Sequence, residues 1–184
     1  ILTIFANSVA TTIYVNADTT MIGLLSGDYY VGLYSLAVKI YNVIKTMLAA
    51  IYSVAIPRIS FFAGQNDKGK VKQVFTSVCA DLTIILLPAG VGLATISKEV
   101  VIIMGGTEYL DSALTLQILS FSLIGAVFGG LFTYCLNIPL GREKINVKAT
   151  TISALVNVGL NVIIIPIFKH NGAAFTTALA EYLV

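Results

Sequence analysis

The fold class is decided by residues 113–136, ALTLQILSFSLIGAVFGGLFTYCL, which contain no Asp, Glu, Lys or Arg. A helix needs about 20 predominantly apolar residues to cross the hydrocarbon core of a bilayer, so this run is long enough to span a membrane. Four further runs qualify, and a sixth is cut off by the end of the chain. The five others are residues 2–25, 31–56, 73–96, 149–168 and the truncated run from residue 173 to residue 184. The sequence therefore predicts an all-α membrane protein, a polytopic bundle of about six transmembrane helices.

The composition supports a membrane protein and excludes several other classes. Hydrophobic residues make up 57% of the chain and charged residues 11%, whereas charged residues approach about a quarter of an ordinary soluble domain. The formal charge of +2 and the lack of a long basic run give no reason to expect a nucleic-acid partner. Residues 1–184 are therefore predicted to form a single transmembrane bundle. Because the chain begins and ends inside apolar runs, we interpret it as a fragment of a longer protein.

The basic residues between the apolar runs predict an orientation. The connections at residues 57–72 and 137–148 hold seven Lys and Arg residues, whereas the remaining connections hold only Lys98 and Lys169. Cytoplasmic loops carry an excess of Lys and Arg, so these two connections are predicted to lie in the cytoplasm. The short apolar stretch within residues 98–111 is then expected at the outer interface. Three aromatic residues are also expected there, Tyr29, Tyr30 and Tyr34.

Polar residues recur at helical spacing within three of the predicted spans. Side chains three or four positions apart share one face of a helix, and a polar face is poorly suited to lipid. In the first span the face comprises Asn7, Thr11, Tyr14 and Asp18; in the second it comprises Ser35, Lys39, Asn42 and Thr46, with Lys45 at its flank; in the fifth it comprises Thr150, Ser153, Asn157 and Asn161. We interpret these faces as a path through the membrane, although Asn157 and Asn161 could equally serve as hydrogen-bonding links between helices.

Charged residues inside the spans are the strongest functional candidates. At about 1.5 Å per residue, Asp18 and Lys39 lie about 10 and 12 Å below the outer boundary, close enough to meet. A charge at the centre of a membrane helix costs about 2.5 to 3.5 kcal/mol on insertion scales and therefore usually faces protein or water. One interpretation is structural pairing, of Asp18 with Lys39 and of Asp81 with Lys45. The other is a substrate pathway formed by Asn7, Asp18, Lys39, Asn42, Lys45, Asp81 and Glu181.

The sequence offers little for catalysis or metal binding. It contains no recognisable pairing of nucleophile and base and no phosphate-binding glycine loop. His170 has no neighbouring metal ligands, and Cys79 and Cys135 fall inside apolar runs as small buried thiols. We therefore predict neither an enzyme nor a cofactor. The glycines Gly125 and Gly129 predict close helix packing.

Several motifs, taken in order, resemble a known family. They are DTTMIG at residues 18–23, VGLY at 31–34, AVKI at 37–40, PRIS at 57–60, and GAA at 172–174 followed by Thr177 and Glu181. Together they resemble the second half of bacterial oligosaccharide flippases, which belong to the multidrug/oligosaccharidyl-lipid/polysaccharide exporter superfamily. The resemblance covers nearly the whole chain.

The resemblance implies two six-helix bundles around a central cavity, with this chain as most of the C-terminal bundle and a missing N-terminal half as its partner. It implies a multi-pass protein of the bacterial cytoplasmic membrane. The implied substrate is an undecaprenyl-diphosphate-linked oligosaccharide for capsule, O-antigen or a related polysaccharide, with Lys39 and Lys45 meeting the diphosphate. The alternatives are a drug or organic-cation antiporter of the same superfamily and, less favoured, a membrane-embedded polysaccharide polymerase or ligase.

Overall fold

The computed structural model describes residues 16–183, and all regular secondary structure in that part of the chain is helical. Four of its helices are long and apolar enough to cross a membrane. The prediction of an all-α, multi-pass membrane protein is thereby confirmed. Asn7, Thr11 and Tyr14 of the first polar face lie outside the described residues.

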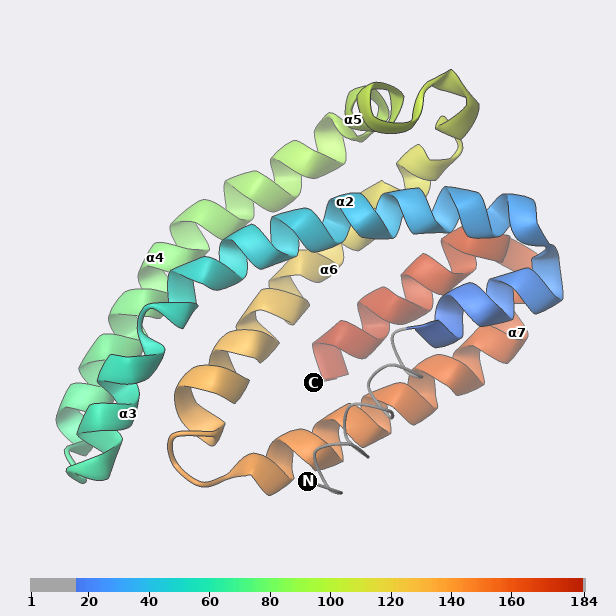
Figure 1. Ribbon diagram of the computed structural model, residues 1–184. Helices are drawn as coiled ribbons and strands as arrows, with labels where there is room; N and C mark the ends of the chain where they lie inside the picture. The colour runs from blue at the N-terminus through green and yellow to red at the C-terminus, as the bar shows by residue number, and fades with distance from the viewer. Residues whose placement is uncertain (1–15, 184) are drawn as a thin grey trace.

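The described chain begins with a helical segment, residues 16–26, and continues through longer and shorter helices in sequence (Figure 1). These are α2 (Asp28–Ser53), α3 (Ile56–Gly64), α4 (Lys68–Thr95), α5 (Ser97–Gly105), the 3-10 helix η1 (Thr107–Tyr109), α6 (Ser112–Phe132), the π-helical turn η2 (Thr133–Asn137) and α7 (Glu143–Leu183).

The ends of the helices follow from local chemistry. Gly27 has φ 98°, a value that suits glycine, and it separates the first helical segment from α2. Pro57 lies in the first turn of α3, where its missing N–H costs nothing. The side chain of Asp67 accepts a 3.0 Å hydrogen bond from the backbone N–H of Lys70 and so caps α4. The predicted loop at residues 57–72 is thus largely helical, because it contains α3 and the start of α4.

Helix α7 is a hairpin of two limbs, residues 143–168 and residues 170–183. Lys169 has non-helical angles, φ 53° and ψ −134°, and Figure 1 shows the chain turning back at this end. Gly172 lies at the corner, where an added Cβ would come within 2.9 Å of the Ile164 carbonyl oxygen. The two limbs correspond to the fifth and sixth spans expected from the sequence.

Helix α6 occupies the centre of the bundle and packs against α2, α4 and α7. Leu116, Leu119, Leu123 and Leu131 are each 0% exposed. A helix that is enclosed on most sides is apolar on most sides, which explains the uncharged sequence that first identified this span. Helix α6 and the second limb of α7 approach each other closely at Gly125, where an added Cβ would lie 3.0 Å from the Glu181 carbonyl oxygen.

The outer surfaces of the peripheral helices are apolar. Ile84 of α4 is 70% exposed, as is Leu155 of α7, and Ile163 is 65% exposed. In a soluble protein such surfaces would favour aggregation. In a bilayer they face hydrocarbon, so polar or charged residues on an exposed face require a separate explanation.

Candidate functional site

The carboxylate of Asp18 is the centre of a buried polar cluster, and it is 7% exposed. Its Oδ2 accepts hydrogen bonds of 2.8 Å from the Tyr34 hydroxyl and 2.6 Å from the Thr177 hydroxyl. Its Oδ1 accepts a 2.6 Å hydrogen bond from Nδ2 of Asn161. These donors come from α2 and from both limbs of α7, so one carboxylate joins four helical segments.

The asparagines of the fifth span extend this cluster. Asn157 and Asn161 are 1% and 0% exposed, and Asn161 also donates a 3.3 Å hydrogen bond to Oδ1 of Asn157. The Thr176 hydroxyl of the second limb donates to Oδ1 of Asn161. Among the described residues, Nδ2 of Asn157 is buried without a hydrogen-bond partner. Of the two interpretations open for these asparagines, linking helices by hydrogen bonds is the one that their contacts support.

A second cluster joins α2 to the end of α7 through an ion pair. Nζ of Lys45 lies 2.5 Å from Oε1 of Glu181, with side chains 34% and 20% exposed. The Tyr41 hydroxyl donates to the same oxygen at 3.4 Å, and Nζ of Lys45 lies 5.6 Å from the centre of the Tyr41 ring. The lysine therefore has an acidic partner while both side chains remain partly accessible.

Lys39 and Asn42 lie on an exposed face of α2, as does Thr46. Lys39 forms no ion pair within residues 16–183. Because α2 is a membrane-spanning helix by length and composition, an exposed lysine and amide in it need water or further protein beside them. The polar face expected on the second span is thus present and is turned away from the core of this bundle.

The ion pairs considered from the sequence are not formed in the described part of the chain. Asp18 does not pair with Lys39. Asp18 contacts the face of α2 that carries Tyr34, and Lys39, five residues further along the helix, points about 140° away from that face. Lys45 pairs with Glu181 rather than with Asp81. Tyr34 is 3% exposed and donates to Asp18, so its side chain is enclosed within the bundle.

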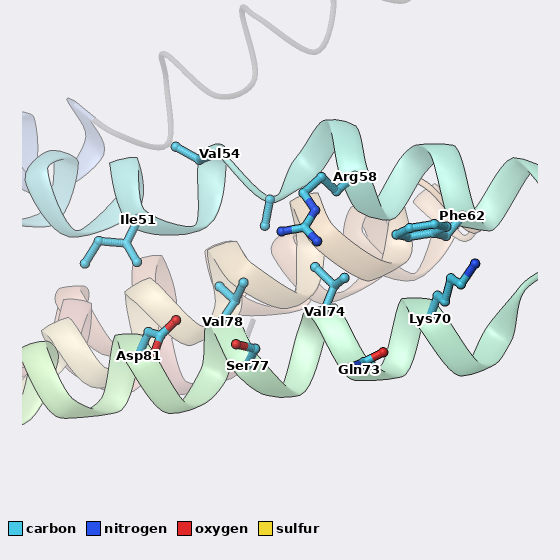
Figure 2. Close-up of a pocket in the computed structure, with 11 residues that line it drawn as sticks. Ile51, Val54, Arg58, Phe62, Lys70, Gln73, Val74, Ser77, Val78 and Asp81 are labelled. Carbon is cyan, nitrogen blue, oxygen red and sulfur yellow. The ribbon is translucent and has the colours of Figure 1, made fainter.

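Asp81 belongs to a different site, a cavity of about 490 Å³ between α2, α3 and α4. Figure 2 shows Asp81 on α4, with Arg58 reaching from α3 into the same gap. The walls are mainly apolar, with Ile51 and Val78 among them.

The seven candidate residues from the sequence are therefore divided among different places: Asp18 is in the buried cluster, Lys45 and Glu181 form a pair, Lys39 and Asn42 are on the exposed face of α2, Asp81 is in this cavity, and Asn7 lies outside the described residues.

Five participants were not selected from the sequence as site residues: Tyr34, Tyr41, Thr176, Thr177 and Arg58. Tyr34 and Thr177 are neutral and lie far apart in the chain, so no spacing rule links them to Asp18. Each does lie within a motif that carries the family resemblance, which is the signal that could have identified it. Arg58 was counted as a loop charge and as part of the PRIS motif, and it lies in α3.

The fold and these clusters define a polytopic helical membrane protein that keeps charged side chains within its spans. The chain belongs to the family described as polysaccharide biosynthesis protein, whose family model matches residues 2–114. No solved structure matches the chain.

Relatives of this chain are found in two archaea. A protein of Haloferax volcanii named as a probable low-salt glycan biosynthesis flippase is 28% identical over 163 residues, which cover 89% of this chain and 34% of that protein. An uncharacterized membrane protein of Methanocaldococcus jannaschii is 26% identical, with 91% of this chain and 35% of that protein covered. A second Haloferax volcanii protein, named as a probable flippase, is 24% identical, with 90% and 35% covered. The chain thus spans about a third of the length of these relatives.

Proposed function

We propose that the protein containing this chain moves a lipid-linked glycan from one leaflet of a membrane to the other. Membership of a polysaccharide biosynthesis family supports this proposal, and so does similarity to two proteins named as flippases. It makes the protein a transporter rather than an enzyme. The relatives are archaeal, so they lend no support to the bacterial membrane that the resemblance implies. An undecaprenyl diphosphate carrier, with capsule or O-antigen as the product, rests on that resemblance alone.

The observation that carries the proposal is the polar face of α2. Lys39, Asn42 and Thr46 are exposed on a helix that is apolar enough to span a membrane. A glycan with an anionic carrier group needs hydrogen-bonding partners and a positive charge along its route, whereas the carrier chain can stay in lipid. We infer that this face of α2 lines a hydrated cavity, the opposite wall of which belongs to an N-terminal bundle of the longer protein.

The Lys45–Glu181 pair suits transient binding of an anion. An ammonium that is partly shielded from water attracts a phosphate more strongly than one in bulk solvent. A substrate that bound a fixed, unpaired charge too tightly would be released slowly. Glu181, at 2.5 Å from Lys45, provides an alternative partner when the substrate leaves. Lys39 has no such partner in residues 16–183, so on this face of α2 it is the positive charge that is free to meet an anionic group.

The test is a leaflet-resolved transport assay on the complete protein in liposomes that contain a fluorescent lipid-linked oligosaccharide. Lys39→Gln should slow flipping about tenfold or more, and Lys39→Arg should retain most of it. Lys144→Gln is the matched control, because Lys144 is an exposed lysine of this chain that lies outside the three sites. Equal rates for Lys39→Gln and Lys144→Gln would exclude Lys39 from the pathway. Absence of flipping by the unaltered protein with every lipid-linked glycan would refute the proposed function itself.

The antiporter alternative has less support from the contacts. Export of an organic cation requires an accessible acid in the path. Of the acids proposed for the path, Asp18 is buried and bound by three donors, and Glu181 is already paired with Lys45. Asp81 is exposed, so inhibition of drug export by Asp81→Asn would favour the antiporter over the flippase.

A further inference from the structure

A second cavity, of about 340 Å³, lies at the end of the bundle where α3 turns into α4. Three basic residues line it and come from two distant parts of the chain. Lys68 and Lys72 lie one turn apart at the start of α4, and Arg142 follows η2 in the connection to α7. We call this the basic-end cavity. It is separate from the polar face of α2 and from the cavity that contains Asp81.

The charges of the basic-end cavity are not balanced within the described chain. Its lining includes no Asp or Glu, and its three basic residues form no ion pair with any residue in the range 16–183. Asp67 is adjacent in sequence, but its carboxylate lies 3.6 Å from Nζ of Lys70 and caps α4. Folding therefore gathers three like charges around one hollow, an arrangement that an anion would stabilise.

The opposite side of the basic-end cavity is apolar. Phe75, Leu136 and Leu140 contribute to its lining, and Leu140 is 40% exposed. The ring of Phe75 is held in place by Phe132, with ring centres 5.3 Å apart. A free phosphate would use only the basic rim. A molecule with a phosphate at one end and a hydrocarbon chain at the other would use both surfaces.

The predicted orientation of the bundle indicates which phosphate-bearing molecule this cavity meets. The basic connections place this end of the bundle at the cytoplasmic surface of the membrane, where anionic phospholipids give the leaflet a negative potential. Basic pockets between membrane helices on that side are suited to anionic headgroups. From the charge and the apolar wall together, we propose that the basic-end cavity binds one anionic phospholipid of the bilayer. Its phosphate lies between Lys72 and Arg142, and an acyl chain lies along Phe75 and Leu140.

Arg142 and the lysines contribute differently to such a site. The guanidinium of Arg142 can hold two phosphate oxygens at once, whereas each lysine acts as a single positive charge. A basic residue that lines the cavity and contacts the bound phosphate is expected to contribute on the order of a fivefold gain in affinity. Removing Lys72 and Arg142 together should therefore weaken lipid binding about 25-fold.

The experiment is a titration of the complete purified protein with phosphatidylglycerol or phosphatidylcholine, read by native mass spectrometry. The unaltered protein should retain phosphatidylglycerol in preference to phosphatidylcholine. Lys72→Gln with Arg142→Gln should remove this preference. Lys144→Gln with Lys148→Gln is the matched control, because it removes two charges from the same predicted side without altering the cavity lining. The control should keep at least a third of the affinity.

Three results would overturn the assignment: no preference for phosphatidylglycerol, an equal loss in both double variants, or displacement of the lipid by millimolar glycerol phosphate. The last would show that the cavity binds a soluble phosphate rather than a phospholipid. If the cavity variant does not fold, Lys72→Arg with Arg142→Lys preserves the total charge and should keep phosphatidylglycerol bound more weakly. Loss of the preference in that folded variant would also count against the site. Because the readout is binding, its outcome is independent of whether the protein flips a glycan.

Discussion

Asn161 donates a 2.6 Å hydrogen bond from Nδ2 to Oδ1 of Asp18, across 143 residues of sequence. Asp18 lies in the helical segment at residues 16–26, and Asn161 lies in the first limb of α7. The Tyr34 and Thr177 hydroxyls bind the other carboxylate oxygen. All these contacts are made within the bundle interior. The main role of Asp18, the most buried of the charged candidates, is therefore to hold these helices together.

Replacing Asp18 should therefore lower stability before it affects transport. Asp18→Ala removes three buried hydrogen bonds between helices, which should cost about 2 to 4 kcal/mol, although Asn161 keeps its bond to Asn157 and the Tyr34 and Thr177 hydroxyls keep their 3.2 Å contact. Asp18→Asn should cost less because one acceptor oxygen remains. Thermal unfolding of the purified protein in detergent measures both effects. Thr20→Ala is the control on the same segment, because the hydrogen bond of the Thr20 hydroxyl within residues 16–183 goes to the Asn16 carbonyl oxygen of its own helix. Equal melting temperatures for Asp18→Ala and Thr20→Ala would contradict the structural role.

Much of the fold could be predicted from the sequence because a membrane span can be recognised from the length and apolar composition of one continuous run of residues. A run such as residues 113–136 is long, apolar and uncharged, and only a helix satisfies its backbone within lipid. The corner at Lys169 was also anticipated as the boundary between two spans. The helix α3 was missed because its charged residue and two adjacent phenylalanines resemble an interfacial loop.

The partners within the site could not be predicted in the same way. Depth along a helix is given by the rise per residue, and this suggested pairing Asp18 with Lys39 and Asp81 with Lys45, neither of which pairs in residues 16–183. The rotation of one helix against another is set by packing and not by depth, so the pairing of Lys45 with Glu181 could not be deduced from the rise per residue. A close approach at Gly125 brings Glu181 and the second limb of α7 against α6. The spacing of Gly125 and Gly129 predicted close packing but did not identify the helix that packs there.

The Lys45–Glu181 pair should show energetic coupling in a double-mutant cycle. Lys45→Gln and Glu181→Gln should each lower stability, and the double variant should lose roughly 1 kcal/mol less than their sum, a modest value because both side chains are partly exposed. The matched cycle pairs Lys45→Gln with Asp81→Asn and should be additive, since Asp81 lies in another cavity. Denaturant or thermal unfolding measures both cycles. Coupling in the Asp81 cycle alone would restore the pairing first considered from the sequence.

The packing of α6 against α7 should be sensitive to a single methyl group. Gly125→Ala would place a Cβ 3.0 Å from the backbone oxygen of Glu181, which cannot move without shifting the limb, so a loss of about 1 to 3 kcal/mol is expected. Gly159→Ala is the control, because nothing lies within 4 Å of the Cβ it would gain. Alanine is also the better helix former. Gly159→Ala should leave the melting temperature unchanged or raise it, and a larger loss there than at Gly125 would contradict the packing.

The orientation of the bundle can be tested by labelling single cysteines in intact cells. Cys79 and Cys135 must first be replaced, and alanine suits Cys135, which is 0% exposed. A cysteine at Asp28, exposed at the start of α2, should react with an impermeant thiol reagent, whereas a cysteine at Asn66 should react only after the membrane is opened. Asn66 has φ 56°, which asparagine tolerates better than cysteine. Gln65→Cys, also exposed in the same turn, is therefore the safer variant.

Labelling of both sites after permeabilisation is the control for accessibility of the two cysteines. The expected pattern follows from seven basic residues in the two connections assigned to the cytoplasm against two elsewhere. The opposite pattern, with Gln65→Cys labelled from outside and Asp28→Cys protected, would reverse every depth assigned to Lys39 and Lys45. It would also place the basic-end cavity at the outer surface, where the leaflet potential no longer favours an anionic phospholipid there.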